Sequence, residues 1–449
     1  MKIDTSCAYV GPKRLGLWLE PGISQANGWV LMYAAYVTIG LLTFVNNGQA
    51  FVMSAVLNLP ADQQGTVAGN LAFVTEMVTI ALIAPFGVLS DRIGRRPVYA
   101  FGMIAMALGY FLYPLATSVE DLTLYRLVYA VGTAAATGMI GTIVNDYPQE
   151  PARGKMVAVT GIFNALGVIT VALVLGRLPA VLERNGMDSF HAIEYAHWVV
   201  AAVCVVSAIV IATGLKKGTP VKHEDKLPLK DLVLSGLRNA KNLRISLAYS
   251  SAFVARGDLV IVGVFVTLWG TVAGIADGLS PAQAGGKAAI LFATVQMSAT
   301  LWAPFMGIIL DRFNRVFALT FAMFLASAGY LCMGLIDHPL ERANLPFFVL
   351  LGVGQISAFF ASQALIGQEA PRAERGSVIG FFGFCGAVGI LLATGVGGRL
   401  FDEWMQAGPF VFVGAMNFCV FLFGLYVCKA APGPKPLSRA ERKAALEAA

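Results

Sequence analysis

The stretch GVLSDRIGRRPVYAFG, residues 87–102, places four charged residues and a proline between two long apolar segments. These are Asp91, Arg92, Arg95, Arg96 and Pro97. Charged side chains are costly inside a bilayer, and proline interrupts a helix interior. We therefore interpret the stretch as a tight turn at a membrane surface, where one spanning helix ends and the next begins.

The rest of the chain is apolar enough to supply many such helices. Of its 449 residues, 57% are hydrophobic and 13% are charged, whereas soluble domains contain about 25% charged residues. The apolar windows are long enough to cross a hydrocarbon core of about 30 Å, and they lack the period-two alternation of barrel strands. The sequence therefore predicts an all-α membrane protein with twelve spans, near 29–55, 66–90, 97–117, 122–146, 157–179, 196–215, 246–272, 287–310, 315–336, 346–367, 376–398 and 409–430.

Basic residues are distributed unevenly between the two sides that these spans define. With both termini in the cytoplasm, 25 of the 32 Lys and Arg residues fall in cytoplasmic segments and 5 in outer segments. This asymmetry accounts for the net charge of +6 without a nucleic-acid partner. The outer five are Arg177, Arg184, Lys287, Arg342 and Arg399.

The opening motif recurs in the second part of the chain. GVLSDRIGRR at 87–96 matches GIILDRFNRV at 307–316, and ARGKMVAVTGIFNALG at 152–167 matches ERGSVIGFFGFCGAVG at 374–389. Gly87, Asp91, Arg92 and Arg95 thereby correspond to Gly307, Asp311, Arg312 and Arg315. Two matches at nearly the same offset predict two pseudo-symmetric six-helix bundles, as in transporters built from repeats.

The resulting segments are a cytoplasmic lead-in (1–28), a first bundle (29–215), a Lys-rich cytoplasmic linker (216–245), a second bundle (246–430) and a cytoplasmic tail (431–449). Six scattered cysteines form no CxxC pair, and no metal or cofactor site is expected.

Residues 87–97 resemble the signature between the second and third helices of the major facilitator superfamily, Gly-x-Leu-x-Asp-Arg-x-Gly-Arg-Arg, at every defined position. The resemblance implies the major facilitator fold. It also implies a monomeric secondary transporter, not an enzyme, that moves a small molecule across a bilayer by alternating access. The bacterial inner membrane is the expected location.

By the same resemblance, the turn and its copy form a cytoplasmic gate. Asp91 would face the start of the eleventh span near Gly376, and Asp311 the start of the fifth span near Gly154. The alternative is that the arginines only hold the turn on the cytoplasmic side of the membrane. That role would explain the arginines, but it requires neither the acids nor the spacing of the glycines.

Each arginine of the gate then needs an anion. The resemblance assigns Asp146 to Arg95, and Glu369 occupies the corresponding place for Arg315. These links are expected to form when the cytoplasmic mouth closes and to break when it opens.

Four charged residues are expected within the bilayer, where each costs roughly 2.5–3.5 kcal/mol on insertion scales. Arg126 resembles an arginine that the superfamily associates with proton coupling or substrate binding, although snorkelling to the outer headgroups is an alternative. Arg256 and Asp258 point about 200° apart on a helix and cannot pair with each other. Glu76 is either a proton carrier or the fixed partner of an arginine.

Amides add hydrogen-bonding capacity at the same depth. By resemblance, the first, fourth, seventh and tenth spans line the cavity, so we expect substrate contacts from Asn46, Asn47, Gln49, Gln355 and Gln363. Two arginines and two acids indicate a solute that is anionic or zwitterionic, cotransported with a proton. Proton-driven efflux of drugs or amphipathic metabolites, or lipid flipping, is the alternative. By resemblance, drug and proton antiporters of the superfamily often carry a Gly-Pro motif in the fifth span. This chain has none before Arg177, which favours symport or facilitated movement over drug efflux.

Overall fold

The structure is a computed structural model, and it describes residues 18–149, 152–218, 236–371 and 374–433. Twelve of its helices are long and apolar enough to cross a membrane, which confirms the predicted number of spans. Apart from one isolated β-bridge between Leu19 and Pro148, the described residues contain no β-structure.

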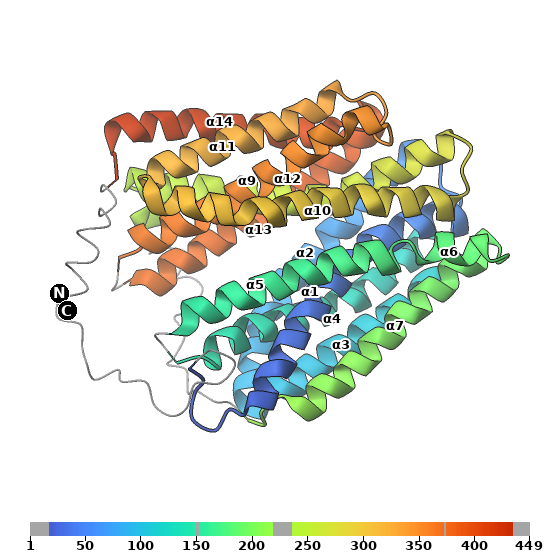
Figure 1. Cartoon of the computed structure of the whole chain (residues 1–449), viewed down its shortest axis with the longest axis horizontal. Coiled ribbons are helices and arrows are strands. Elements are labelled where there is room, and N and C mark those ends of the chain that lie inside the picture. Colours follow the sequence, from blue (N-terminus) through green and yellow to red (C-terminus); the bar gives the residue numbers. More distant parts are fainter. Residues whose placement is uncertain (1–17, 150–151, 219–235, 372–373, 434–449) are drawn as a thin grey trace.

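The first six spans form one half of the molecule, coloured blue to green in Figure 1. Their elements are α1 (Gln25–Phe51) with the π-helical η1 (Val52–Val56), α2 (Ala61–Ile93), α3 (Arg95–Leu112) with η2 (Tyr113–Leu115), α4 (Val119–Asp146), α5 (Arg153–Thr170) with η4 (Val171–Leu175) and α6 (Leu178–Arg184), and α7 (Ser189–Gly214).

The last six spans form the other half, coloured yellow-green to red. Their elements are α9 (Leu243–Ala276), α10 (Pro281–Arg312), α11 (Arg315–Leu331) with η5 (Cys332–Leu335), η6 (Arg342–Asn344) with α12 (Leu345–Glu369), α13 (Arg375–Glu403) and α14 (Gly408–Ala430). The seventh span therefore begins at Leu243, inside the predicted linker, most of which lies outside the described residues.

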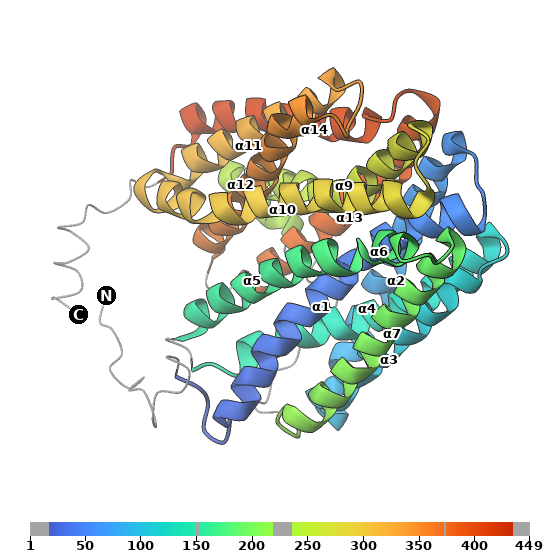
Figure 2. The same ribbon diagram turned by 45° about the vertical axis from the view of Figure 1, so that its right-hand side comes forward.

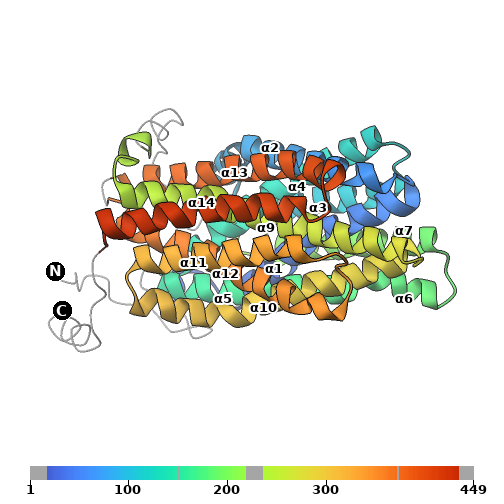
Figure 3. The same ribbon diagram turned by 90° about the horizontal axis from the view of Figure 1, so that it is seen from above.

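The same packing scheme is repeated in both halves. In the first, α3 packs on α4 and α7, while α1 packs on α5 and α2 on α4. In the second, α11 packs on α12 and α14, while α9 packs on α13 and α10 on α12. Even an interior proline recurs, as Pro85 in α2 and Pro304 in α10. Seen from above, the spans run roughly along one common axis (Figure 3).

Polar side chains fix where several spans begin. Ser24, Ser118, Asp188 and Ser280 accept hydrogen bonds from backbone N–H groups in the first turns of α1, α4, α7 and α10. Such caps satisfy donors that would otherwise remain unpaired. They place the ends of long apolar helices at defined residues, which apolar composition alone does not do.

The two ends of the bundle differ. We term the end with the turns at 91–95 and 311–315 the signature end, and the end with the turns at 57–60 and 277–280 the opposite end. Figures 1 and 2 show α5 and α10 converging toward the opposite end and spreading apart toward the signature end. The principal contact between the halves is α2 against α13.

Candidate functional site

The signature turn is organised around Arg95. Gly94 has a φ of +97°, a conformation that favours glycine, and it reverses the chain between α2 and α3. Arg95 is buried, and its Nε donates to Asp146 Oδ2 at 3.2 Å. Its Nη1 donates to Ser90 Oγ and to Asp91 Oδ1. The expected contact between Arg95 and Asp146 is therefore present, and it joins α2, α3 and α4 within the first half.

The copy of this turn is built differently, and the expected pair of Arg315 with Glu369 is wrong. Arg315 Nη1 donates to the carbonyl of Ala364 at 3.0 Å, whereas Glu369 Oε2 lies 3.2 Å from Arg244 Nε. Asn314 replaces Gly94 and has an ordinary φ of −58°, so the backbone takes another path. Arg244 lies in the first turn of α9, which begins three residues earlier than predicted.

Arg92 and Arg312 are exposed at their turns. The contacts expected for Asp91 at the start of α13, and for Asp311 at the start of α5, remain predictions. The gating role of the whole set, including Gly87, remains a prediction too.

Arg126 is buried inside the first half. Its Nε donates to Thr75 Oγ1 of α2 at 2.7 Å, and its guanidinium lies 5.1 Å from the centre of the Tyr129 ring. Nη1 is buried without a hydrogen-bond partner in the described chain. This arrangement contradicts snorkelling and leaves one donor of the arginine available.

Glu76 and Arg256 face each other across the interface between the halves. The two charges interact electrostatically, Glu76 from α2 and Arg256 from α9. The Arg256 side chain lies directly over Gly386 of α13, where a Cβ would collide with it. Both residues lie near the middle of their helices, so two opposite charges, one from each half, interact deep in the bundle without a direct ion pair between them.

Asp258 points the other way, into the core of the second half. It is fully buried, and both carboxylate oxygens accept from Asn417 Nδ2 of α14, at 3.0 and 3.2 Å. Tyr330 of α11 donates to the Asp258 carbonyl at 2.9 Å. The prediction that Arg256 and Asp258 need different partners is confirmed.

Three of the five predicted amides, Asn47 and Gln49 of α1 and Gln355 of α12, are buried, and all three lack partners for at least one polar atom. Asn46 lies against Gly263 of α9, and Asn47 against Gly176. Asn47 Oδ1, Gln49 Oε1 and both polar atoms of Gln355 are buried and make no hydrogen bond to the described chain. Gln363, by contrast, is exposed on α12.

The sequence analysis missed His197, which lies in α7 and is fully buried. Its Nδ1 bonds to the Ile193 carbonyl at 2.8 Å, while Nε2 has no partner among the described residues and packs against Gly48. The ring also stacks on Tyr113, with 6.1 Å between ring centres. The sequence feature that could have identified it is a histidine within an otherwise apolar segment.

The halves are joined at the opposite end by two acids. Asp402, at the end of α13, accepts from the N–H groups of Gly65 and Thr66 in α2, at 2.8 and 2.6 Å. Glu183, at the end of α6, accepts from Ser280 Oγ at the start of α10, at 2.6 Å. Each half thus places a carboxylate near the start of a helix of the other half, where the helix dipole favours negative charge.

Among the described residues, the glycines of α13 show that main-chain contact with α2 is close at this end and absent nearer the signature end. A Cβ at Gly398 of α13 would lie 2.5 Å from the Gly65 carbonyl oxygen. At Gly383, nearer the signature end of α13, it would meet no described atom within 4 Å. A cavity of about 410 Å³ lies nearby within the first half, between α2 and α4, and is lined in part by Gly87 and Asp146. Within the described part of the chain, the halves are therefore in close contact at the opposite end, and α5 and α10 diverge toward the signature end (Figures 1 and 2).

Comparison with known proteins identifies the family. The sequence model of the Major Facilitator Superfamily matches residues 32–394 and, in a second match, residues 259–448. The chain belongs to the Major Facilitator Superfamily. It is therefore a member of a transporter superfamily and not of an enzyme class.

Individual members of the superfamily match along most of the chain. Magnetosome protein MamH of Paramagnetospirillum magneticum is 30% identical, over 91% of this chain and 94% of that protein. Inner membrane transport protein YajR of Escherichia coli is 26% identical over 75% of this chain and 70% of its own. Among solved structures, nucleoside transporter NupG superimposes with a TM-score of 0.71 at 16% identity, covering 89% of this chain and 98% of that chain. These matches establish the fold and the family, and the cargo is a separate question.

Proposed function

We propose that this transporter cotransports a proton with a small organic solute that carries a negative group, by rocking its two halves about a central site. The observation that carries the proposal is the Glu76 and Arg256 pair, a titratable charge pair placed between the two moving parts. Protonation of one member changes the attraction between the halves directly.

The carboxylate of Glu76 is the proposed proton carrier. When it is charged, its attraction to Arg256 holds α2 toward α9 and α13; when it is protonated, that attraction is lost. Proton binding therefore favours the arrangement in which the two side chains are apart, and this differential affinity is what couples a ligand to a conformational change. Glu76 is only partly buried, so protons can reach it from an open mouth.

Asp258 fits this role less well than Glu76. Its carboxylate is enclosed within the second half and bonded to Asn417, so its protonation state does not act across the interface. We assign it to positioning α9 against α14.

The unpaired amides of α1 and α12 are the proposed substrate contacts. Burying a polar group without a partner costs about 1–3 kcal/mol, so Asn47, Gln49 and Gln355 favour a solute that offers donors and acceptors. The free Nη1 of Arg126 supplies the cation for the negative group. Such a solute satisfies groups that the folded chain leaves unpaired.

We further propose that the signature end faces the cytoplasm and that the protein acts as a monomer in the inner membrane. The bias of 25 of 32 basic residues toward that side supports the orientation. In this orientation the structure is inward-facing.

Transport into proteoliposomes tests the proposal. A panel of anionic, zwitterionic and neutral solutes is offered with and without an inward proton gradient, and accumulation is expected only with the gradient. Glu76→Gln should transport without responding to the gradient, while Asp258→Asn, the matched control, keeps the response. Gradient-independent uptake by the wild type would refute coupling. Outward drug movement or transfer of labelled lipid in place of uptake would refute the proposed direction and cargo.

A further inference from the structure

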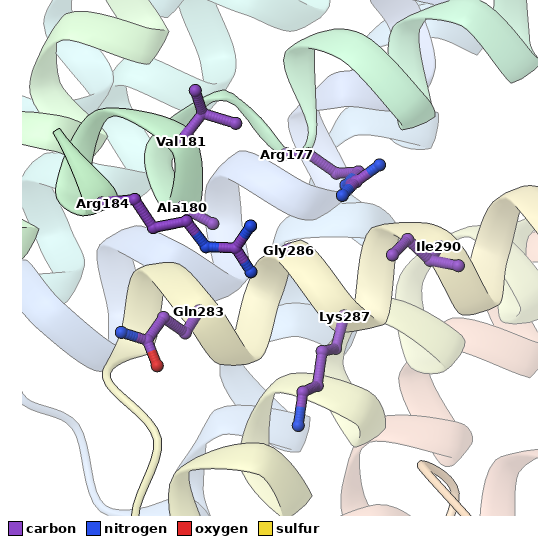
Figure 4. A pocket seen from close by; sticks show the side chains of 8 residues that line it. All are labelled: Arg177, Ala180, Val181, Arg184, Gln283, Gly286, Lys287 and Ile290. Carbon is purple, nitrogen blue, oxygen red and sulfur yellow. The ribbon is translucent and has the colours of Figure 1, made fainter. Parts of the chain in front are cut away.

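A second, smaller cavity lies at the opposite end, between α6 of the first half and α10 of the second. It measures about 90 Å³, and its polar lining consists of Arg177, Arg184, Gln283 and Lys287. Figure 4 shows the Arg184 guanidinium directed at α10 beside Gly286. Arg177, at the start of α6, lies over a later part of α10, toward Ile290. The cavity is separate from the buried amides and from the signature turn.

The charge of this cavity is unusual for its side of the protein. Only five Lys and Arg residues fall in segments assigned to this side, and three of them line this one cavity. The remaining two, Arg342 and Arg399, are not part of the lining. Most of the few basic residues on this side therefore lie at one contact between the two halves.

These cations lack counter-charges within the part of the chain that the structure describes. None of the eight lining residues is acidic, and no ion pair joins Arg177, Arg184 or Lys287 to a described carboxylate. Glu183, the neighbouring acid, is bonded to Ser280. Like charges from both halves therefore line one cavity at the end where the halves close, the two guanidinium groups on one side of α10 and the Lys287 amine directed to its other side (Figure 4). Their mutual repulsion opposes that closure.

We propose that the cavity binds a phosphate-type oxyanion, presented by an anionic phospholipid headgroup or free in solution. Guanidinium groups match the geometry of phosphate oxygens, and Lys287 adds a third charge. The volume is that of a few water molecules, at about 30 Å³ of liquid volume for each, so it admits the oxyanion group and not a whole organic solute.

Occupancy of this site stabilises the state that is closed at the opposite end. The lining comes from both halves, so the site disperses when α6 and α10 separate. A ligand shifts a conformational equilibrium by its difference in affinity for the two states, and this anion has its full set of partners in one state alone. The anion thus regulates the transport cycle without being its cargo.

The test measures opening of the opposite end in the full-length protein. Spin labels at Asn185 and Glu341, in a background without native cysteines, report the separation of the halves by pulsed electron resonance in nanodiscs. The lipid is phosphatidylcholine alone, the same lipid with inorganic phosphate, or a mixture with phosphatidylglycerol. The ratio of closed to open molecules should rise about tenfold with the anion, a coupling typical of allosteric ligands.

The double variant R177Q/R184Q should lose this response, while Arg342→Gln, which removes an exposed arginine outside the cavity, should keep it. A response to phosphatidylglycerol alone identifies the lipid headgroup as the source of the anion, and a response to phosphate alone identifies the free ion. An unchanged ratio in the wild type, or an equal response in the double variant, overturns the proposal.

Discussion

Replacing Asp402 by asparagine should open the opposite end. The carboxylate accepts two short hydrogen bonds from the N–H groups of Gly65 and Thr66, across the boundary between the halves. Asparagine has nearly the same shape, but one of its two terminal groups is a donor and would face an N–H group. One hydrogen bond is lost outright, and the other loses its charge assistance.

The size of the effect follows from these two bonds. A hydrogen bond to a charged group contributes about 1.5–3 kcal/mol, and partial exposure of Asp402 reduces the combined loss to about 2 kcal/mol. Because 1.4 kcal/mol corresponds to a factor of ten, the ratio of closed to open molecules should fall about 30-fold. The labels at Asn185 and Glu341 report that ratio directly.

Glu403→Gln is the matched control, since Glu403 is the adjacent acid and is exposed to solvent. It should leave the distance distribution unchanged. If Asp402→Asn also left the distribution unchanged, or if both variants shifted it equally, the inference that this carboxylate holds the two halves together would be refuted.

Three further predictions concern stability and closure. Arg95→Gln should lower the free energy of unfolding by about 3–5 kcal/mol, because it removes the guanidinium from a buried ion pair with Asp146. Arg315→Gln should cost much less, and equal losses in chemical denaturation would contradict the asymmetry of the two turns. Gly398→Ala should reduce transport, because its methyl group meets the α2 backbone, whereas Gly383→Ala should transport normally; equal uptake rates in proteoliposomes would count against closure at that contact. Asn417→Leu should destabilise the protein by about 1–3 kcal/mol, because it removes the side-chain donor of the buried Asp258 carboxylate. An unchanged midpoint of thermal unfolding would show that this carboxyl group needs no donor.

The sequence predicted the spans and the first turn well because both depend on local patterns. Apolar windows reveal membrane helices, and the pairing of Arg95 with Asp146 comes with an intact motif. The copy at 307–316 keeps the charged residues but lacks the glycine that shapes the turn. Its Arg315 therefore bonds to a carbonyl, a change in backbone path that side-chain matching cannot detect.

Contacts between distant helix ends were beyond prediction for a different reason. Glu183 and Asp402 are ordinary acids near the ends of spans, and many such acids simply face water. Their function depends on which helix start lies opposite, and that is set by packing of the two halves. The same holds for Glu76, whose partner could be chosen between two arginines only after the helices were placed.

The contact of Gly65 with Gly398 has a mechanical consequence. Main chain touches main chain there, so neither side can yield by changing a side-chain rotamer, and packed interfaces of this kind have discrete arrangements instead of a continuous range. This contact between α2 and α13 is accordingly stiff, and we expect it to be either fully formed or fully separated. In the proposed cotransport such a contact would prevent leakage, because a partly open intermediate would let protons through without cargo.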